Sequence, residues 1–266
     1  MGDYIIRTLD PTMFAAGTGN DDMWSNGEYA ALQIFLKRGD VIIDVGSAKG
    51  NWSNAALSIT VPKMIFCFEP SEKTYEELFK RFHYRTSNMR LYKNAVGFEN
   101  VDVEFLYYKN YPEMSNFFGR PEVEEQLKIE KEKIIVKCIK LDDFIDKEKI
   151  EKVDYLKIDT EGSELYVLRG CEKALEKNIP QIIQYEFGGA WQDAKMKVKD
   201  AFKLLSKYGY SNFRIVPDGL IYLPQYYPEL DEYKHQNMLA VSKKKAEETF
   251  INFPVFPMLG LEDENG

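Results

Sequence analysis

A stretch near residue 45 joins an acidic side chain to two glycines, at the turn between an expected strand and an expected helix. It reads VIIDVGSAKGNW, with Asp44 two residues before Gly46 and Gly50 four residues after that. Such a turn brings backbone N–H groups and a helix N-terminus next to a bound ligand. A dinucleotide-binding turn has a glycine where this chain has Ala48, and a nucleoside-triphosphate loop has lysine where it has Asn51. Both phosphate-binding patterns are therefore absent.

The charge of Asp44 indicates the kind of ligand that the turn accepts. A carboxylate beside the turn repels a pyrophosphate and attracts a ligand that carries positive charge. S-adenosylmethionine has an ammonium group, a sulfonium group and no phosphate. We therefore expect Asp44, Gly46, Ser47 and Gly50 to border the methionine end of S-adenosylmethionine, with the glycines allowing close approach of the backbone.

A second acid ends the next expected strand, in KMIFCFEP. Glu69 follows the glycine turn by about twenty residues, where a carboxylate accepts the ribose hydroxyls of an adenosine. The alternative is a surface acid that stabilises the following helix. Dehydrogenases use the same acid, so Glu69 indicates an adenosine rather than one cofactor. We expect Pro70, Asn94 and Ala95 to border the cofactor, with the last two beside the adenine and Asp142 nearby.

Two further acids lie at the ends of expected strands and are the candidates for chemistry. Asp159 ends VDYLKID and Glu186 lies near the end of PQIIQYEF, and the ligand of a parallel sheet binds at the carboxyl ends of its strands. They would hold either a divalent cation such as Mg²⁺ or the acceptor hydroxyl itself, with His235 as a reserve base and Asp159 also touching the cofactor. The alternatives are purely structural roles, in which Asp159 caps a helix and Glu186 binds a backbone amide or an arginine.

The order of strands and helices predicts an α/β protein with a mostly parallel sheet covered by helices on both faces. Apolar strands alternate with amphipathic helices from residue 41 onward. Two alternating segments, 101–108 and 133–141, predict an inserted antiparallel hairpin. We expect an N-terminal arm and helix over 1–40, a catalytic domain over 41–245 with an insertion at about 108–133, and a tail over 246–266. The seven expected strands contain VIIDV, KMIFCF, RLYKNAVG, VDYLKID, PQIIQYEF, NFRIV and NMLAVS.

Four motifs occur in this chain in a specific order: CFEPSEKTYEEL, LYKNAVG, IKLDDFI and VDYLKIDTEGSELYVLRGCEKAL. Together with the glycine turn they resemble the FkbM family of S-adenosylmethionine-dependent methyltransferases, over roughly Val41 to Gly189. The middle of the turn, Ser47 to Lys49, departs from the residues common in that family. The resemblance implies a Rossmann-like class I fold with a seven-stranded sheet. It also implies an O-methyltransferase that acts on a sugar, a glycan or a small-molecule hydroxyl.

Composition limits the partners of the chain. The net charge is −8, with 35 basic and 43 acidic residues, which disfavours a nucleic-acid substrate. No run approaches the length of a membrane span, and the first residues lack the features of a signal peptide, so we expect no membrane partner. Cys67, Cys138 and Cys171 are far apart and odd in number. They are expected to be buried reduced thiols, which fits a cytoplasmic location.

Two alternative functions and the roles of two local features remain open. One alternative is an NAD-type oxidoreductase on a similar sheet, which the missing glycine and Asp44 disfavour. The other is a non-catalytic relative that binds the cofactor. Tyr185 and Trp191 flank Glu186 and would stack on a sugar ring or belong to the core. The segment 110–123 is expected to form a loop near the acceptor pocket, more mobile than the sheet; the alternative is a surface hairpin with its two Phe rings on a helix.

Overall fold

A computed structural model describes residues 5–10, 13–85 and 87–250. Within them, one mixed sheet has nine strands in the order β1-β11-β10-β12-β9-β8-β2-β3-β4. The strands are β1 (Ile5–Thr8), β2 (Val41–Val45), β3 (Met64–Phe68), β4 (Met89–Tyr92), β8 (Tyr155–Ile158), β9 (Ile182–Phe187), β10 (Tyr210–Val216), β11 (Gly219–Leu223) and β12 (Gln236–Ser242). The five strands from β9 to β4 are parallel to one another. Beyond them, β12 pairs antiparallel with β9, β10 with β12, and β11 with β10.

The seven expected strands are the seven consecutive strands from β10 to β4, so the predicted class I sheet is confirmed. Two strands that the sequence analysis did not anticipate, β11 and β1, extend its far edge. The expected N-terminal arm therefore contains a strand, because β1 pairs with β11. The segment RLYKNAVG is also not one strand. It divides into β4 and a separate strand, β5 (Ala95–Gly97), which joins a second sheet.

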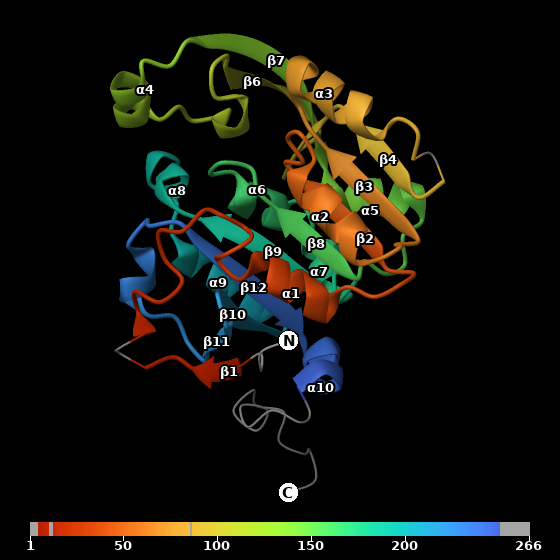
Figure 1. Ribbon diagram of the computed structural model, residues 1–266, viewed down its shortest axis with the longest axis vertical. Helices are drawn as coiled ribbons and strands as arrows, with labels where there is room; N and C mark the ends of the chain where they lie inside the picture. The colour runs from red at the N-terminus through yellow and green to blue at the C-terminus, as the bar shows by residue number, and fades with distance from the viewer. Residues whose placement is uncertain (1–4, 11–12, 86, 251–266) are drawn as a thin grey trace, which may run out of the picture.

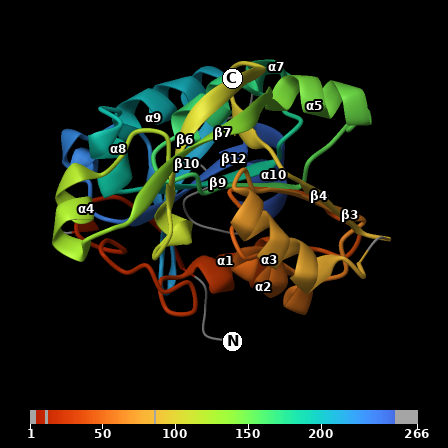
Figure 2. The same ribbon diagram turned by 90° about the horizontal axis from the view of Figure 1, so that it is seen from above.

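Helices cover both faces of the main sheet, as predicted (Figure 2). One face carries α1 (Glu28–Phe35), α2 (Asn51–Ile59), α3 (Glu72–Phe82) and α10 (Lys243–Phe250), and the other carries α5 (Leu141–Glu148), α6 (Glu164–Arg169), α7 (Glu172–Glu176) and α9 (Val198–Lys207). Each layer buries an apolar cluster against the continuous apolar strands. The rigid sheet that results fixes the positions of the loops that follow its strands.

The predicted hairpin forms the second sheet, in which β7 (Lys131–Lys140) pairs antiparallel with β6 (Val101–Tyr108) and parallel with β5. Its connection contains η2 (Pro112–Met114) and α4 (Pro121–Leu127). Figure 1 shows the hairpin and α4 at the top of the molecule, next to the short helix α8 (Gly189–Asp193). The insertion therefore extends over one end of the main sheet.

The N-terminal arm is tied to the main sheet through a buried arginine. Arg214 of β10 is fully buried, and its Nη1 donates hydrogen bonds to the carbonyl oxygens of Phe14 at 2.7 Å and Ala16 at 3.0 Å. At the other terminus, α10 includes residues 246–250 of the expected tail, and residues 251–266 lie outside the described residues. The three cysteines are buried and free, as expected. No described helix has the length and apolarity that crossing a membrane requires.

Gly46 ends β2 with a positive φ of 80° and lies against the backbone that follows β8. A Cβ atom added at Gly46 would lie 1.7 Å from the carbonyl oxygen of Asp159. The two strand ends can therefore approach closely only while residue 46 has no side chain.

We expect Gly46→Ala to destabilise the fold through both the positive φ and this overlap. The matched control is Gly39→Ala, because Gly39 has a φ of 88° but no atom within 4 Å of an added Cβ. The control should lose about 1–2 kcal/mol of unfolding free energy, and Gly46→Ala a further ~1–3 kcal/mol. Urea unfolding of the two variants measures the difference, and equal losses would contradict the close approach.

Candidate functional site

A pocket with about 490 Å³ of empty space lies where the sequence predicted the cofactor. The turn after β2, the ends of β3 and β4, the loop after β8 and the insertion form its walls. Among the lining residues are Gly46, Ala48, Glu69, Pro70, Asn94, Ala95, Asp159, Thr160 and Glu161. Of the predicted cofactor residues, the structure therefore brings Gly46, Glu69, Pro70, Asn94, Ala95 and Asp159 together.

Glu69 is almost fully buried in this pocket, and its Oε1 accepts a hydrogen bond from the backbone N–H of Ser71 at 2.9 Å. Ser71 is the N-cap residue of α3, so Glu69 supports the start of that helix, as the alternative anticipated, and also lines the pocket. Burial raises the pKa of Glu69 to about 7, although the backbone hydrogen bonds from Ser71 and Ala48 act to lower it. A ligand hydroxyl that donates to Glu69 would stabilise its charged form.

The acid of the glycine turn lies beneath the turn rather than in the pocket. Asp44 is 1% exposed, and its Oδ2 accepts a hydrogen bond from Ser53 Oγ of α2 at 2.5 Å. Burial raises the pKa of Asp44 to about 6. Ser47 Oγ donates to the backbone oxygen of Asp44 at 2.8 Å, which closes the turn. Asp44 was predicted to contact the methionine end of the cofactor directly. In the structure its carboxylate is buried against α2 and supports the turn from beneath.

Two other predictions for this pocket need correction. Gly50 is the N-cap of α2, and a Cβ added there would lie 2.3 Å from Phe82 of α3, so this glycine allows helix packing rather than approach of a ligand. Asp142 accepts hydrogen bonds from the backbone N–H groups of Lys173 at 3.1 Å and Ala174 at 2.9 Å. Its carboxylate therefore caps α7 and is not among the residues that line the pocket. Ala48, which the sequence analysis used only to exclude phosphates, does line it, with a φ of 44°.

One polar atom in the pocket wall is left without a partner. Thr160 Oγ1 is buried and has no hydrogen-bond partner among the described residues. Such an atom usually costs free energy unless a ligand or water satisfies it. Together with the carboxylate of Glu69, it makes the pocket suitable for a polar ligand.

The pocket opens into a larger cleft with about 2220 Å³ of empty space, which includes open solvent. The two hollows share Gly46, Ala48, Glu113, Asp159 and Glu161 in their walls. Glu186 and His235 line the cleft from the adjacent strand ends, and Glu113, Met114 and Arg120 of the insertion line it from the other side. The expected position of the 110–123 loop beside the cleft is therefore what the structure has. Of its two Phe rings, Phe118 also contacts Tyr166 of α6, as the alternative anticipated.

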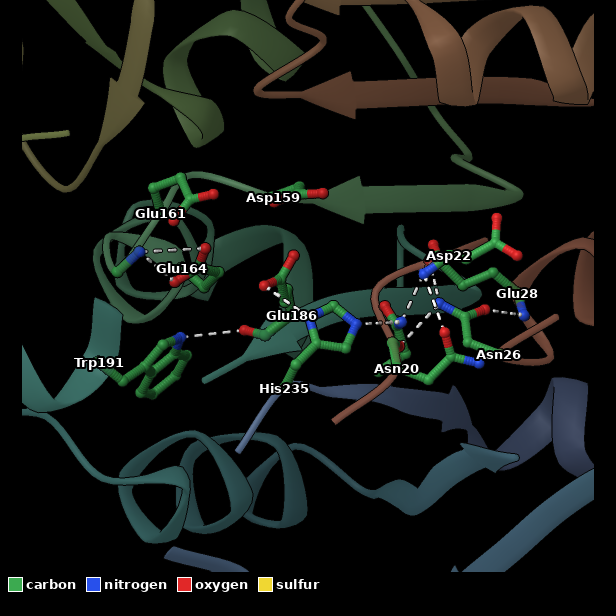
Figure 3. Close-up of polar contacts among 12 residues, drawn as sticks. Asn20, Asp22, Asn26, Glu28, Asp159, Glu161, Glu164, Glu186, Trp191 and His235 are labelled. Carbon is green, nitrogen blue, oxygen red and sulfur yellow. Dashed lines mark hydrogen bonds and ion pairs between the residues drawn. The ribbon is translucent and has the colours of Figure 1, made fainter. Parts of the chain in front are cut away.

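Asp159, Glu186 and His235 lie beside one another in this cleft (Figure 3). Glu186 Oε1 and His235 Nδ1 are 3.0 Å apart, and Asp159 Oδ2 lies 3.4 Å from Lys157 Nζ. The three predicted chemical residues are thus assembled at one strand-end edge. Each predicted carboxylate also has a cationic partner that the sequence analysis did not assign to it.

These contacts set the protonation of the group. Enclosure in the cleft and the neighbouring Glu186 carboxylate raise the pKa of Asp159 well above its usual range, although the charge of Lys157 acts to lower it. Burial acts to raise the pKa of Glu186, but the hydrogen bond and charge of His235, with the charge of Lys157, lower it overall. Burial acts to lower the pKa of His235, but Glu186 raises it overall. Asp159 is therefore the carboxylate that accepts a proton more readily.

A buried polar network behind these residues was missed by the sequence analysis. Glu28 of α1 accepts hydrogen bonds from Lys157 Nζ at 3.2 Å and from Gln184 Nε2 at 2.6 Å. Asn237 Nδ2 lies 3.1 Å from Glu28 Oε1 and 3.3 Å from His235 Nε2. The available signal was the presence of Lys157 and Gln184 inside otherwise apolar strands, since such residues are seldom buried without partners.

The insertion is joined to the cleft by a second arginine. Arg120 Nη1 lies 3.2 Å from Glu161 Oε2, and Arg120 Nε lies 3.4 Å from Asp193 Oδ2. Glu161 therefore pairs with the insertion. The neighbouring Glu164 accepts the Thr160 N–H at 2.7 Å, and this bond ties the loop after β8 to the first residue of α6.

The predicted divalent cation does not fit this donor set. Among the described residues, no group of three or more His, Cys, Asp or Glu side chains lies in an arrangement that could hold a metal ion. Asp159 and Glu186 already face Lys157 and His235, and these cations supply the positive charge that a metal would bring. We therefore derive no metal-assisted step.

The two aromatic residues beside Glu186 belong to the core. Tyr185 is fully buried and Trp191 is 1% exposed, and the indole N–H of Trp191 donates to the backbone oxygen of Glu186 at 3.0 Å. Stacking of Tyr185 or Trp191 on a sugar is therefore excluded. Their ring contacts support the strand end that carries Glu186.

Known proteins share this architecture. A family model described as the methyltransferase FkbM domain matches residues 44–211. The hexuronic acid methyltransferase AglP of Haloferax volcanii is 25% identical over 184 residues, which are 68% of this chain and 69% of that protein. The crystal structure of methyltransferase FkbM from Methylobacillus flagellatus KT superposes with a TM-score of 0.50 and 13% identity. That match covers 77% of this chain but only 44% of the longer solved chain.

The buried pair of Glu28 and Lys157 should be essential for stability. Lys157→Met removes the cation and leaves Glu28 buried with its charge uncompensated, which should cost about 3–5 kcal/mol of unfolding free energy. Adding Glu28→Gln should recover part of the loss. Lys152→Met is the control, because Lys152 is exposed and pairs with Asp154 at the surface, and it should change stability by less than ~1 kcal/mol. Equal urea midpoints for the two lysine variants would contradict the assignment.

Proposed function

Since the chain belongs to the FkbM family of methyltransferases, we propose that it transfers the methyl group of S-adenosylmethionine to a hydroxyl oxygen of a carbohydrate. The oxidoreductase alternative is set aside by the family. The proposal rests mainly on one observation, the location of Asp159. Asp159 borders both the smaller pocket and the larger cleft, so it lies where a cofactor and an acceptor would meet.

The residues of the smaller pocket suit the cofactor. Glu69 would accept the ribose hydroxyls, Asn94 and Ala95 would border the adenine, and the turn at Gly46 and Ala48 would lie against the methionine end. The unpartnered Thr160 Oγ1 offers a further polar contact. When bound, S-adenosylmethionine supplies an electrophilic methyl group on a sulfonium. The field of the buried Asp44 favours that positive charge from beneath the turn.

The residues of the cleft suit removal of a proton from an alcohol. An alkyl hydroxyl is a weak nucleophile near neutral pH and needs a base as its oxygen forms the new bond. Asp159 takes that proton in our proposal, because its pKa is raised and it borders the cofactor pocket. Glu186 and His235 hold the acceptor hydroxyl in line, and His235 remains the reserve base. Correct alignment of the acceptor oxygen supplies much of the rate.

The acceptor class is inferred from the relative and from the cleft. AglP is a hexuronic acid methyltransferase, and the polar, open cleft of this chain suits a hydroxyl-rich molecule. Carboxylates such as Glu186 bind sugar hydroxyls well because each oxygen accepts hydrogen bonds. A carbohydrate is therefore the acceptor that we propose.

Cofactor binding can be tested without knowledge of the acceptor. In calorimetry with S-adenosylhomocysteine, Glu69→Ala should lose about 1.5–3 kcal/mol, or roughly 10- to 150-fold in affinity. Hydroxyl donors favour the Glu69 carboxylate, and its pKa in the free protein is about 7. Affinity should therefore rise between pH 6 and pH 8 in the wild type and stay flat in Glu69→Gln. Glu76→Ala, on the exposed side of α3, is the control; if its loss matches that of Glu69→Ala, Glu69 is not in the site.

Catalysis can be tested with S-adenosylmethionine and a panel of neutral, uronic and amino sugars. We expect methyl transfer that resists the chelator EDTA, because Lys157 and His235 already neutralise the carboxylates. The rate should rise with pH through the raised pKa of Asp159. Asp159→Asn should cost on the order of 10²-fold, whereas Asp218→Asn, at an exposed site, should be neutral. Wild-type turnover by Asp159→Asn would exclude Asp159 as the base, and loss of turnover with EDTA would restore the metal.

A further inference from the structure

One aromatic side chain in the cleft is unusually exposed. Of the three tryptophans, Trp52 and Trp191 are buried, whereas Trp24 is 63% exposed. Trp24 lines the same cleft as Asp159, Glu186 and His235. Its ring lies 4.6 Å from that of Tyr29, between centroids, and this contact supports one part of the indole. A large aromatic surface left open beside reactive groups is a typical feature of a binding site.

The loop that carries Trp24 is held by its own hydrogen bonds. Asp22 accepts a hydrogen bond from the Trp24 N–H at 3.3 Å and from Ser25 Oγ at 2.6 Å. The Asn26 N–H donates to the Asp22 carbonyl oxygen at 2.9 Å, and Asn26 Nδ2 continues to Glu28 at 3.0 Å. Figure 3 shows this loop beside His235. Trp24 is therefore presented by an ordered segment, which lowers the entropy lost when a ligand binds.

The same loop is bonded to the reactive end of the cleft. The Gly19 N–H donates a hydrogen bond to the carbonyl oxygen of His235 at 2.8 Å. Asp21, three residues before Trp24, also lines the cleft and provides carboxylate acceptors there. A sugar ring has an apolar C–H face and a rim of hydroxyls, and this combination of an aromatic face and carboxylates complements both.

The size of the cleft indicates more than one ring. The cleft itself has a volume of about 1030 Å³, at the upper end of the ~300–1,000 Å³ range of small-molecule sites, and it has room for more than one sugar ring. We propose that Trp24 is a stacking platform for a second sugar ring of an oligosaccharide acceptor, linked to the ring that is methylated beside Asp159. This inference rests on the proposed carbohydrate methyl transfer and adds a residue that selects acceptor length.

The test compares Trp24→Ala, Trp24→Tyr and a matched control. Tyr84→Ala removes an aromatic ring of similar exposure, 66%, that does not line the cleft. Each protein is assayed with S-adenosylmethionine and with mono-, di- and tetrasaccharides of neutral hexoses, hexuronic acids or N-acetylhexosamines. Trp24→Ala should raise KM for the best oligosaccharide about 10-fold and leave kcat unchanged. KM for the matching monosaccharide should not change, Trp24→Tyr should retain most of the oligosaccharide preference, and Tyr84→Ala should behave as the wild type.

The outcomes separate this inference from the function on which it rests. Oligosaccharide methylation with the same KM in Trp24→Ala would overturn the platform and leave the proposed function intact. An equal rise of KM for mono- and oligosaccharides would also overturn it, because the ring would then contact the methylated sugar or act on the fold. Absence of methylation of every carbohydrate by the wild type, with S-adenosylhomocysteine still bound, would overturn both.

Discussion

The buried ion pair of Glu28 and Lys157 is the interaction on which the candidate site depends. It connects the first helix to the strand that ends at Asp159, across the centre of the sheet. Burial acts to raise the pKa of Glu28, but Lys157, Asn26 and Gln184 lower it overall, so the carboxylate stays charged. A buried charge of this kind is tolerated only when its partner and its hydrogen bonds are all present. The positions of the residues around it are therefore strongly constrained.

This constraint also explains how several acids share one cleft. Lys157 contacts both Glu28 and Asp159, and His235 contacts Glu186, while Arg120 contacts Glu161. Each cation neutralises one carboxylate more completely than the others, so neighbouring acids acquire different proton affinities. Such separation of pKa values within a cluster is characteristic of sites that move protons.

The sequence predicted the parts of the site that follow from strand order. Glu69, Asp159 and Glu186 all end parallel strands, and the carboxyl ends of such strands meet at one edge. It was wrong for Asp142 and Gly50, because helices pack beside them in ways that no local pattern encodes. It also missed Glu28, which occupies an ordinary position in a helix until the fold brings β8 and β9 against it. Strand β1 was missed because its partner, β11, lies more than two hundred residues away in the sequence.

Glu28 lies outside the region of family similarity, although the fold depends on it. The family similarity begins at residue 44, yet the carboxylate that compensates Lys157 comes from residue 28 and is joined to the sheet by the arm that Arg214 holds. A chain trimmed to residues 44–211 would keep Glu69, Asp159 and Glu186. It would lose Glu28, the buried carboxylate that compensates the Lys157 ammonium group. The folded unit therefore depends on a segment that lies before the region recognised by sequence similarity.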